Sequence, residues 1–539
     1  MNKKIIFIAD CFVDQIAGGG ELNNEELIDM LRQKKYDVKK MHSHFVDERF
    51  LEENKKSFFI ISNFLAMKPH LREQLYDLEY VIYEHDHKYI TERNPALHKH
   101  FQAPPTSLVN YFFYKHAKAV LCQSGFHKKI LESNLNIKNV INLSGNLWSL
   151  SSLEKMRNIS SKTKQDKCSI MDSRIQHKNT IGAISLCNDK GYDYQLIQDS
   201  NYFGFLEKLG LNKKFAFLPR TPETLSRVVV EARMMGCGVL TNGLVGAAQE
   251  HWFELKGEEL VDYMIEKRDD ILSTFENLIN SDSKKERPLV SMITTFCEGG
   301  EFLQSFLENI TNQTIFSQCE LIIVDANSQG NEKDIISTYT EKYDNIVYCR
   351  LEKKLKPTPC INIASMLSSG KYISWSFLDD LKSPDCIEVL LGEITDHDVD
   401  LVYGDVLVTD KYNSHFNRDV SSTVLENSSF DFSRENMIKC LPGPMPLYKA
   451  SLHDRCGFFD TINCDYADDW EMWLRAVDRG CVFKKINKTI GMYLSGGRSQ
   501  QNDIAQRKEE AEIFYKYSHV FGNNFKKFKP YFDQFIGRT

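Results

Sequence analysis

The stretch Gly370-Lys-Tyr-Ile-Ser-Trp-Ser-Phe-Leu-Asp379-Asp380 decides the fold predicted for the C-terminal half of this 539-residue chain. It is typical of an apolar β-strand that ends in two adjacent carboxylates. In an open parallel sheet, ligands bind beyond the carboxyl ends of the strands. Two carboxylates at that edge suit a divalent cation, which prefers hard oxygen ligands. Taken alone, an Asp-Asp pair after a strand is usually a solvated turn or a helix cap.

Three further sequence blocks occur before and after this strand. Their order along the chain is a more specific indication of function than any one block alone. Val290–Glu298 is a strand that opens into a loop, and Leu321–Asp325 is an apolar strand followed by small polar residues. Asp468-Asp469-Trp-Glu-Met-Trp-Leu-Arg475 opens an amphipathic helix with acidic residues in its first turn. Acidic residues there stabilise a helix without any chemistry. Three sets of carboxylates at one edge can also bind a base, hold a cation and remove a proton from a hydroxyl.

With these four blocks, residues 288 to about 500 resemble the inverting glycosyltransferase family 2, which has a GT-A fold. Gly457-Phe-Phe-Asp460 is similar to the family's acceptor-side block. The resemblance implies that Asp325 contacts the nucleotide base, that Asp379 ligates Mg²⁺ or Mn²⁺, and that Asp469 is the general base. It implies a donor site in this module formed by Thr294, Phe296, Glu298, Asp325, Asp379, Asp380 and Arg498.

The implied reaction is a single displacement. An acceptor hydroxyl, deprotonated by Asp469, attacks the anomeric carbon while the metal neutralises the departing nucleoside diphosphate. Two positions depart from the family pattern: Phe377 stands at the first acidic or amide position of the metal motif, and Ser495 lies near the place of a late histidine. Gly496-Gly-Arg498-Ser499 fits either a loop that closes over the diphosphate or a plain glycine turn.

Ahead of a polar boundary at Ser281–Arg287, short apolar runs alternate with amphipathic helices. This alternation predicts parallel sheets covered on both faces. The expected strands are Lys4–Ala9, Phe58–Ser62, Tyr80–Tyr83, Ala119–Gln123 and Val140–Leu143. A mostly polar run, Ser151–Lys167, is expected to separate them from a second α/β unit.

The second unit carries the block Leu218–Cys237. Thr221 and Pro222 predict a helix start, because proline is pre-shaped for the first helical position. This start would place Glu223 at the mouth of the helix and Glu231 two turns deeper. Glutamates eight residues apart are common by chance, so the spacing needs support from the rest of the chain.

In context, the block resembles the Glu-seven-residues-Glu signature of retaining GT-B glycosyltransferases of family 4. There the first glutamate addresses the transferred sugar and the second the ribose hydroxyls. A glycine-rich first loop and a strand leading into His85-Asp86 agree with the resemblance. Ser173–Asn179, with Arg174 and Lys178, resembles the family's basic segment that holds the diphosphate, although Lys190-Gly191 is a rival for that role. The implied donor-binding residues are Gly19, Gly20, His85, Arg174, Lys178, Glu223 and Glu231.

The predicted fold class is α/β, with an N-terminal GT-B-like pair of Rossmann-type units followed by a GT-A domain. The expected limits are residues 1–150 and 151–280 for the two Rossmann-like units, 281–288 for a linker, 289–500 for the GT-A domain, and 501–539 for a helical tail.

Charge, cysteine content and hydropathy indicate which binding partners and which cellular location to expect. A formal charge of -7 offers no basic field for nucleic acid, which argues against that partner class. Fourteen cysteines without CxxC pairs fit reduced thiols in the cytoplasm. No apolar run approaches a membrane span. Bases mixed with aromatics in Phe521–Ile536 leave two alternatives open, a terminal helix packed on the domain or a membrane-peripheral segment.

Three functional hypotheses follow. The leading one is a bifunctional enzyme that moves sugars from nucleotide-diphospho-sugars to a glycan or lipid-linked acceptor, inverting in the C-terminal module and retaining in the N-terminal one. In the second, only the C-terminal module turns over, and the N-terminal half binds or positions the acceptor. The third is a non-catalytic glycan-binding scaffold. The donor sugar, the acceptor and the oligomeric state are not indicated by any motif.

Overall fold

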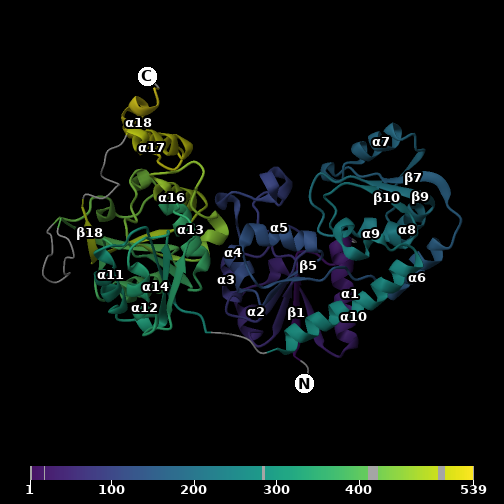
Figure 1. Cartoon of the computed structure of the whole chain (residues 1–539), viewed down its shortest axis with the longest axis horizontal. Coiled ribbons are helices and arrows are strands. Elements are labelled where there is room, and N and C mark those ends of the chain that lie inside the picture. The colour runs from purple at the N-terminus through teal and green to yellow at the C-terminus, as the bar shows by residue number, and fades with distance from the viewer. Residues whose placement is uncertain (1–2, 17, 282–285, 411–422, 496–503, 538–539) are drawn as a thin grey trace. The chain divides into compact units, whose positions relative to one another are not determined.

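The computed structural model describes residues 3–16, 18–281, 286–410, 423–495 and 504–537 (Figure 1). The chain divides into two compact units. One comprises Met1–Ala103 with Asn110–Lys284, and the other comprises Pro104–Val109 with Lys285–Thr539. The predicted α/β class is confirmed, because strands and helices alternate in both units.

The N-terminal unit begins with a parallel sheet in the order β2-β1-β3-β4-β5-β6. Its strands are β1 (Lys4–Ala9), β2 (Asp37–His42), β3 (Phe58–Ile61), β4 (Tyr80–Tyr83), β5 (Ala119–Cys122) and β6 (Val140–Asn142). The central strands are continuous apolar runs, as expected for a sheet covered on both faces. The accompanying helices are α1 (Gly19–Gln33), α2 (Glu48–Glu53), α3 (Pro69–Leu75), α4 (Tyr111–His116) and α5 (Gly125–Leu135).

A second parallel sheet, in the order β10-β9-β7-β8, completes this unit. Its strands are β7 (Gln165–Met171), β8 (Tyr194–Ile197), β9 (Asn212–Phe217) and β10 (Gly238–Thr241). Its helices are α6 (Leu150–Ser160), α7 (Thr180–Asp189), α8 (Tyr202–Gly210) and α9 (Arg227–Met234). The run expected to be a polar separator is largely helix α6, whose Leu153, Met156 and Ile159 are buried.

The last helix of the unit, α10 (Glu258–Asn280), belongs to both sheets (Figure 1). Leu260, Val261 and Met264 at its start lie in the core of the second sheet. Phe275 and Ile279 at its end lie in the core of the first. The end of the predicted 151–280 segment therefore returns to the first sheet.

The C-terminal unit contains a mixed sheet in the order β13-β12-β11-β14-β17-β16-β18-β15. Its strands are β11 (Val290–Phe296), β12 (Cys319–Asp325), β13 (Ile346–Arg350), β14 (Tyr372–Trp375), β15 (Leu381–Lys382), β16 (Leu401–Thr409), β17 (Leu447–Lys449) and β18 (Phe483–Leu494). Strands β13, β12, β11 and β14 are mutually parallel. The helices are α11 (Phe302–Thr311), α12 (Glu332–Thr340), α13 (Pro357–Leu367), α14 (Cys386–His397), α15 (Leu452–Cys456), α16 (Asp468–Asp478), α17 (Ile504–Lys516) and α18 (Asn523–Ile536).

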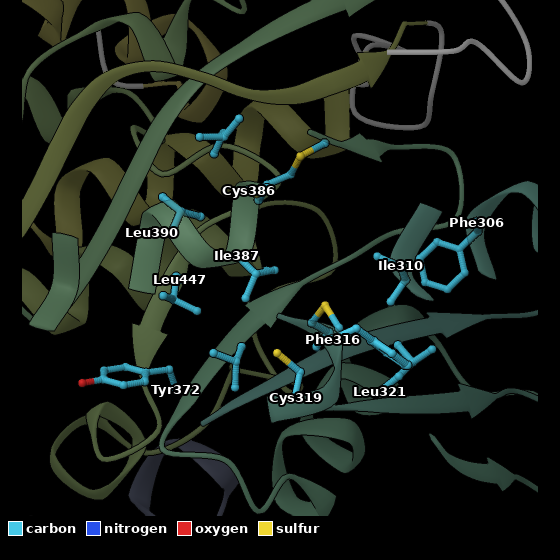
Figure 2. Close-up of a cluster of buried hydrophobic side chains, with 14 of the residues drawn as sticks. Phe306, Ile310, Phe316, Cys319, Leu321, Tyr372, Cys386, Ile387, Leu390 and Leu447 are labelled. Atoms are coloured by element: carbon cyan, nitrogen blue, oxygen red, sulfur yellow. The ribbon is translucent and has the colours of Figure 1, made fainter. Parts of the chain in front are cut away.

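Figure 2 shows part of the core of this sheet. Phe306 and Ile310 of α11 and Leu390 of α14 pack with Leu321 and Leu447 of the strands. All five side chains are almost completely buried. Burial of each such side chain contributes roughly 1.5–3 kcal/mol, and this fixes the sheet whose edge carries the predicted site.

The two C-terminal helices pack on the unit through aromatic rings. The Phe532 ring of α18 stacks on Phe514 of α17 with centroids 4.2 Å apart, and it faces Trp470 of α16 at 6.3 Å. Lys526, Lys527 and Lys529 on α18 are exposed. Within the described part of the chain, no helix is both long and apolar enough to span a membrane.

Candidate active sites

The predicted C-terminal site lies at one edge of the sheet. The register of β11 places Phe296 beside Asp325 of β12, and Ile293 beside Trp375 of β14. Because these strands are adjacent and parallel, their carboxyl ends meet at the same edge. Asp325 and the pair Asp379–Asp380 therefore lie at the edge that the sequence predicts.

Asp325 is 1% exposed and its carboxylate is engaged by protein donors. Oδ1 accepts a hydrogen bond from the Ser328 backbone N at 2.7 Å, and Oδ2 accepts one from the Tyr348 hydroxyl at 2.7 Å. Ser328 Oγ in turn accepts from the Glu298 backbone N at 2.7 Å. Asp325 thus orients Ser328, and Ser328 connects the loops after β11 and β12. The contact of Asp325 with a nucleotide base stays a prediction.

The other predicted donor-binding residues of β11 differ in exposure. Thr294 is fully buried, and within the described residues its Oγ1 has no hydrogen-bond partner. Phe296 is partly buried. Glu298 is exposed and has a left-handed backbone with φ of 63°. Arg498 lies outside the described residues.

The Asp379–Asp380 pair has the features that a hard cation needs. Asp380 is 5% exposed, and among the described residues its Oδ1 has no hydrogen-bond partner. Burial and the neighbouring Asp379 charge raise the pKa of Asp380 well above its ordinary value. A divalent cation would compensate such a buried, unpartnered carboxylate oxygen, so the pair fits the implied metal. The described residues hold no group of three or more His, Cys, Asp or Glu side chains placed to bind a metal.

Asp468 and Asp469 begin helix α16. The Asp469 carboxylate accepts hydrogen bonds from the Trp470 backbone N at 2.6 Å and from Cys440 Sγ at 3.3 Å. Burial raises the pKa of Asp469, and burial together with the Asp469 charge raises the pKa of Asp468 to about 6. Both residues are partly exposed.

Helix α13 connects these aspartates to the sheet edge. Lys356, the residue before its first turn, pairs with the Asp465 carboxylate at 2.6 Å, three residues ahead of Asp468. Because α13 follows the parallel strand β13 and packs on β11 and β12, its first turn lies at their carboxyl edge. The two acidic pairs are thereby brought to the same edge of one sheet.

The N-terminal unit has a pocket of about 440 Å³ lined by elements of both its sheets. Six predicted residues line it: Gly19, Gly20, His85, Lys178, Glu223 and Glu231. Arg174 is exposed and does not appear in the pocket wall. Residues separated by more than 200 positions in the chain therefore share one pocket, as the proposed signature requires.

The predicted helix start at Thr221–Pro222 is wrong, because α9 begins at Arg227. The backbone of Glu223 pairs with a neighbouring segment instead. Its N–H donates to the Leu244 carbonyl at 2.8 Å, and its carbonyl accepts from the Gly246 N–H at 3.0 Å. Glu223 thus stands on an extended segment, where its carboxylate pairs with Lys178 Nζ at 2.8 Å.

Glu231 is 3% exposed and lies on α9. Its Oε1 accepts hydrogen bonds from Trp148 Nε1 at 2.9 Å and from the Tyr202 hydroxyl at 2.7 Å. Arg227 Nε lies 3.6 Å from the same oxygen. The contacts that orient this carboxylate therefore fall on one of its oxygens.

His85 is held as a neutral imidazole. Gln123 Nε2 donates to Nδ1, so the ring proton is on Nε2, which donates to Asn24 Oδ1 at 2.8 Å. Burial and the nearby charge of Lys88 lower the pKa of His85 well below its ordinary value. The pocket therefore contains a fixed, uncharged ring beside its glycines.

Several residues that line the pocket are not among those predicted from the sequence. Gln123, Asn146, Tyr202 and Arg227 all line the cavity. Asn146 and Tyr202 stand far from any motif, so no local signal marks them. Arg227 could have been predicted as a pocket residue, because it is a basic residue inside the Glu223–Glu231 signature.

Comparison with known proteins gives the class of the C-terminal unit. The family model described as Glycosyl transferase family 2 matches residues 291–459, which include Asp325 and the Asp379–Asp380 pair and end before Asp468. The chain therefore carries a glycosyltransferase domain of family 2.

Two curated relatives are similar to part of the chain. The uncharacterized glycosyltransferase MJ1057 of Methanocaldococcus jannaschii is 28% identical over 128 residues, which cover 23% of this chain and 44% of that protein. The glycosyltransferase GlyG of Streptococcus pneumoniae serotype 4 is 25% identical over 128 residues, which cover 24% and 42%. The chain thus spans less than half the length of these relatives.

Solved structures with some similarity include TarS 1–349 of S. aureus, at 14% identity and a TM-score of 0.35, covering 44% of this chain and 66% of that one. They also include the mannosyltransferase PcManGT of Pyrobaculum calidifontis in complex with GDP-Man and Mn²⁺, at 16% identity and a TM-score of 0.33, covering 43% and 64%. These TM-scores are too low to carry a structural argument.

Proposed function

We propose that the protein transfers sugars from nucleotide-diphospho-sugars and that its C-terminal unit does so by a metal-dependent, inverting displacement. The observation that carries the proposal is the placement of two acidic pairs at one sheet edge of the C-terminal unit. One pair lies inside the residues that match the family 2 model, and the other follows nine residues after their end. Asp379 and Asp380 follow β14, and Asp468 and Asp469 begin α16. One pair suits a cation and the other suits proton removal.

In this proposal Asp469 is the general base. Its carboxylate is oriented by the Trp470 N–H and the Cys440 thiol, so the acceptor hydroxyl would meet a fixed oxygen. A pKa raised by burial makes the carboxylate a stronger base than an exposed aspartate. Asp379 and Asp380 would hold Mg²⁺ or Mn²⁺, which supplies the positive charge that stabilises the departing diphosphate.

We infer a second donor site in the pocket of the N-terminal unit, with retaining transfer of the family 4 type on a GT-B-like pair of sheets. The support is the convergence of Glu223, Lys178 and Glu231 on one cavity between two parallel sheets. Glu223 would contact the transferred sugar, and Glu231 would bind ribose hydroxyls. In the alternative function, this pocket binds or positions the acceptor and does not turn over.

The acceptor is proposed to be a glycan or a lipid-linked sugar, used in the cytoplasm. The exposed Lys526 and Lys527 of α18 favour contact with an anionic membrane surface, whereas Lys529 pairs with Asp533 at 2.6 Å. Co-sedimentation of the chain with phosphatidylglycerol vesicles, compared with neutral phosphatidylcholine vesicles, tests this contact.

Separate substitutions test the two active sites. Transfer from UDP-, GDP-, dTDP- and CMP-sugars would be measured with and without Mn²⁺, and the anomeric configuration of each product read by NMR. Asp469→Asn is expected to lower the rate at which the inverted product forms by about 10²–10⁴-fold. Glu231→Gln is expected to remove only a retained product.

The outcomes separate the hypotheses. If Glu231→Gln leaves every transfer intact, the N-terminal unit is not a second transferase. If Asp469→Asn leaves the inverted product intact, the proposed C-terminal site is wrong. If the unmodified chain neither transfers sugar nor binds nucleotide, the scaffold hypothesis holds.

A further inference from the structure

The wall of the N-terminal pocket contains a cation that the family resemblance did not assign. Arg227 is the first residue of α9 and lines the pocket with its side chain 10% exposed. Its Nη1 donates to the Leu147 carbonyl at 2.6 Å, and its guanidinium lies 4.6 Å from the centre of the Trp148 ring. These contacts hold the guanidinium in place before any ligand binds.

The glycine-rich loop packs closely against the Arg227 side chain. A Cβ atom added at Gly19 would lie 3.0 Å from Arg227 Cδ, closer than carbon atoms normally approach. Gly19 begins α1, so Arg227 lies beside the N-terminus of that 15-residue helix. Helix N-termini carry partial positive charge and favour anions.

The start of α9 also has an unmet hydrogen-bonding group. Ser226 occupies the N-cap position but makes no capping hydrogen bond. Its hydroxyl is buried, and among the described residues it has no partner at all. A serine at this position usually caps the helix, and buried polar atoms are usually satisfied, so an orphaned hydroxyl in a pocket wall points to a ligand.

A second buried atom without a hydrogen-bond partner among the described residues, the Oδ1 of Asn146, indicates another group that the ligand would contain. Asn146 is 2% exposed and lines the same pocket, and its Oδ1 acceptor has no partner within the described residues. This acceptor needs a donor such as a hydroxyl. Positive groups and an unmet acceptor in one cavity fit a ligand with both anionic oxygens and hydroxyls.

We propose that Arg227, with the Ser226 hydroxyl, binds the diphosphate of the donor in the N-terminal pocket, in the role that sequence reasoning gave to Arg174. This inference rests on the proposed second donor site. Among the described residues that line the pocket, Lys178 is the other cation, and Glu223 already neutralises it at 2.8 Å. Arg227 lies farther from its carboxylate, at 3.6 Å from Glu231, and presents a planar fork suited to phosphate oxygens.

The test measures binding of UDP and of GDP to the full chain by calorimetry. EDTA and an Asp380→Asn background suppress metal-dependent binding in the C-terminal unit. Arg227→Met is expected to weaken binding roughly 10–100-fold, as loss of a charge-assisted hydrogen bond to phosphate does. Ser226→Ala is expected to weaken it severalfold. Arg220→Met, an exposed arginine seven residues earlier, is the control for loss of one positive charge.

Each outcome decides between the inference and its premise. If Arg227→Met binds UDP or GDP as tightly as the unmodified chain, or if only Arg174→Met loses affinity, the proposed role of Arg227 is wrong. The second donor site itself would not be contradicted by either result. Absence of UDP and GDP binding in the unmodified N-terminal pocket overturns both. If Arg227→Met lowers Tm, Arg227→Lys supplies the check, because it keeps the charge and is expected to retain part of the affinity.

Discussion

At the residue scale, the Asp469 carboxylate shares a hydrogen bond with an unusual donor, the thiol of Cys440. This bond favours the ionised carboxylate and so lowers the pKa of Asp469 against the effect of burial. Removing the thiol with Cys440→Ala should raise that pKa further. Because the base must be deprotonated to act, the acidic limb of the rate profile should move to higher pH.

The measurement is kcat/KM of the inverted transfer between pH 5 and 8. Cys440→Ser keeps a donor and should keep the limb close to that of the unmodified enzyme. An acidic limb that does not move in Cys440→Ala would show that the thiol does not tune the base.

Asp468 gives a prediction about stability. Burial and the Asp469 charge raise its pKa from 3.8 to about 6, so the folded state binds this proton more tightly than the unfolded state. The favourable contribution is complete below pH 3.8 and is lost as the pH rises through 6. Asp468→Asn carries no charge at any of these pH values, so it should be more stable than the unmodified protein at pH 8.

Thermal unfolding as a function of pH checks this prediction. The Tm of Asp468→Asn should exceed that of the unmodified protein at pH 8, by roughly 2–4 °C for each kcal/mol, and the difference should vanish toward pH 4. A variant that is less stable at pH 8 would contradict the direction of the shift.

At the scale of elements, Gly370 sets how closely β14 approaches β11. A Cβ atom at this position would lie 2.6 Å from the backbone N and from Oγ of Ser291. Gly370→Ala should therefore destabilise the C-terminal unit by about 1–3 kcal/mol in urea unfolding. Gly392→Ala on α14 is the matched control, because nothing lies within 4 Å of its added Cβ, and it should be neutral or slightly stabilising.

Helix α17 holds the start of the helix that bears the base. The Glu509 carboxylate accepts hydrogen bonds from the backbone N–H groups of Asp465, Tyr466 and Ala467 at 2.8, 3.0 and 2.8 Å. Glu509→Ala should free this turn and misplace Asp469, lowering kcat of the inverted transfer about tenfold or more with little change in donor KM. Glu512→Ala, on an exposed position of the same helix, should leave both constants unchanged. Equal losses in the two variants would point to general damage to α17.

Many elements could be read from the sequence because their patterns are local. The strands Lys4–Ala9 and Tyr80–Tyr83 match the predicted bounds, since each is a short apolar run between polar residues. The start of α9 could not be predicted, because the backbone of Glu223 pairs with residues 244–246. No local sequence pattern indicates that pairing. The partners of Glu231 were missed for the same reason, since Trp148 and Tyr202 come from distant segments.

At the scale of the whole molecule, each compact unit has its own hydrophobic core. Phe275 is fully buried in the N-terminal unit, and Phe306 is almost fully buried in the C-terminal unit. Replacing either with alanine should cost about 3–5 kcal/mol, in a different transition for each. Scanning calorimetry should show Phe275→Ala lowering one transition and Phe306→Ala the other. A shared shift in both variants would mean that the units unfold as one.

Helix α10 has a mechanical consequence for the N-terminal pocket. Its 23 residues form a rod of about 34 Å, with one end embedded beneath each wall of the cavity. A change in the distance between the two sheets would therefore strain this helix, because Met264 packs in one core and Ile271 in the other. Arg268, between these two residues, adds a further attachment to the first sheet's side of the unit through its ion pair with Glu26 of α1 at 2.6 Å.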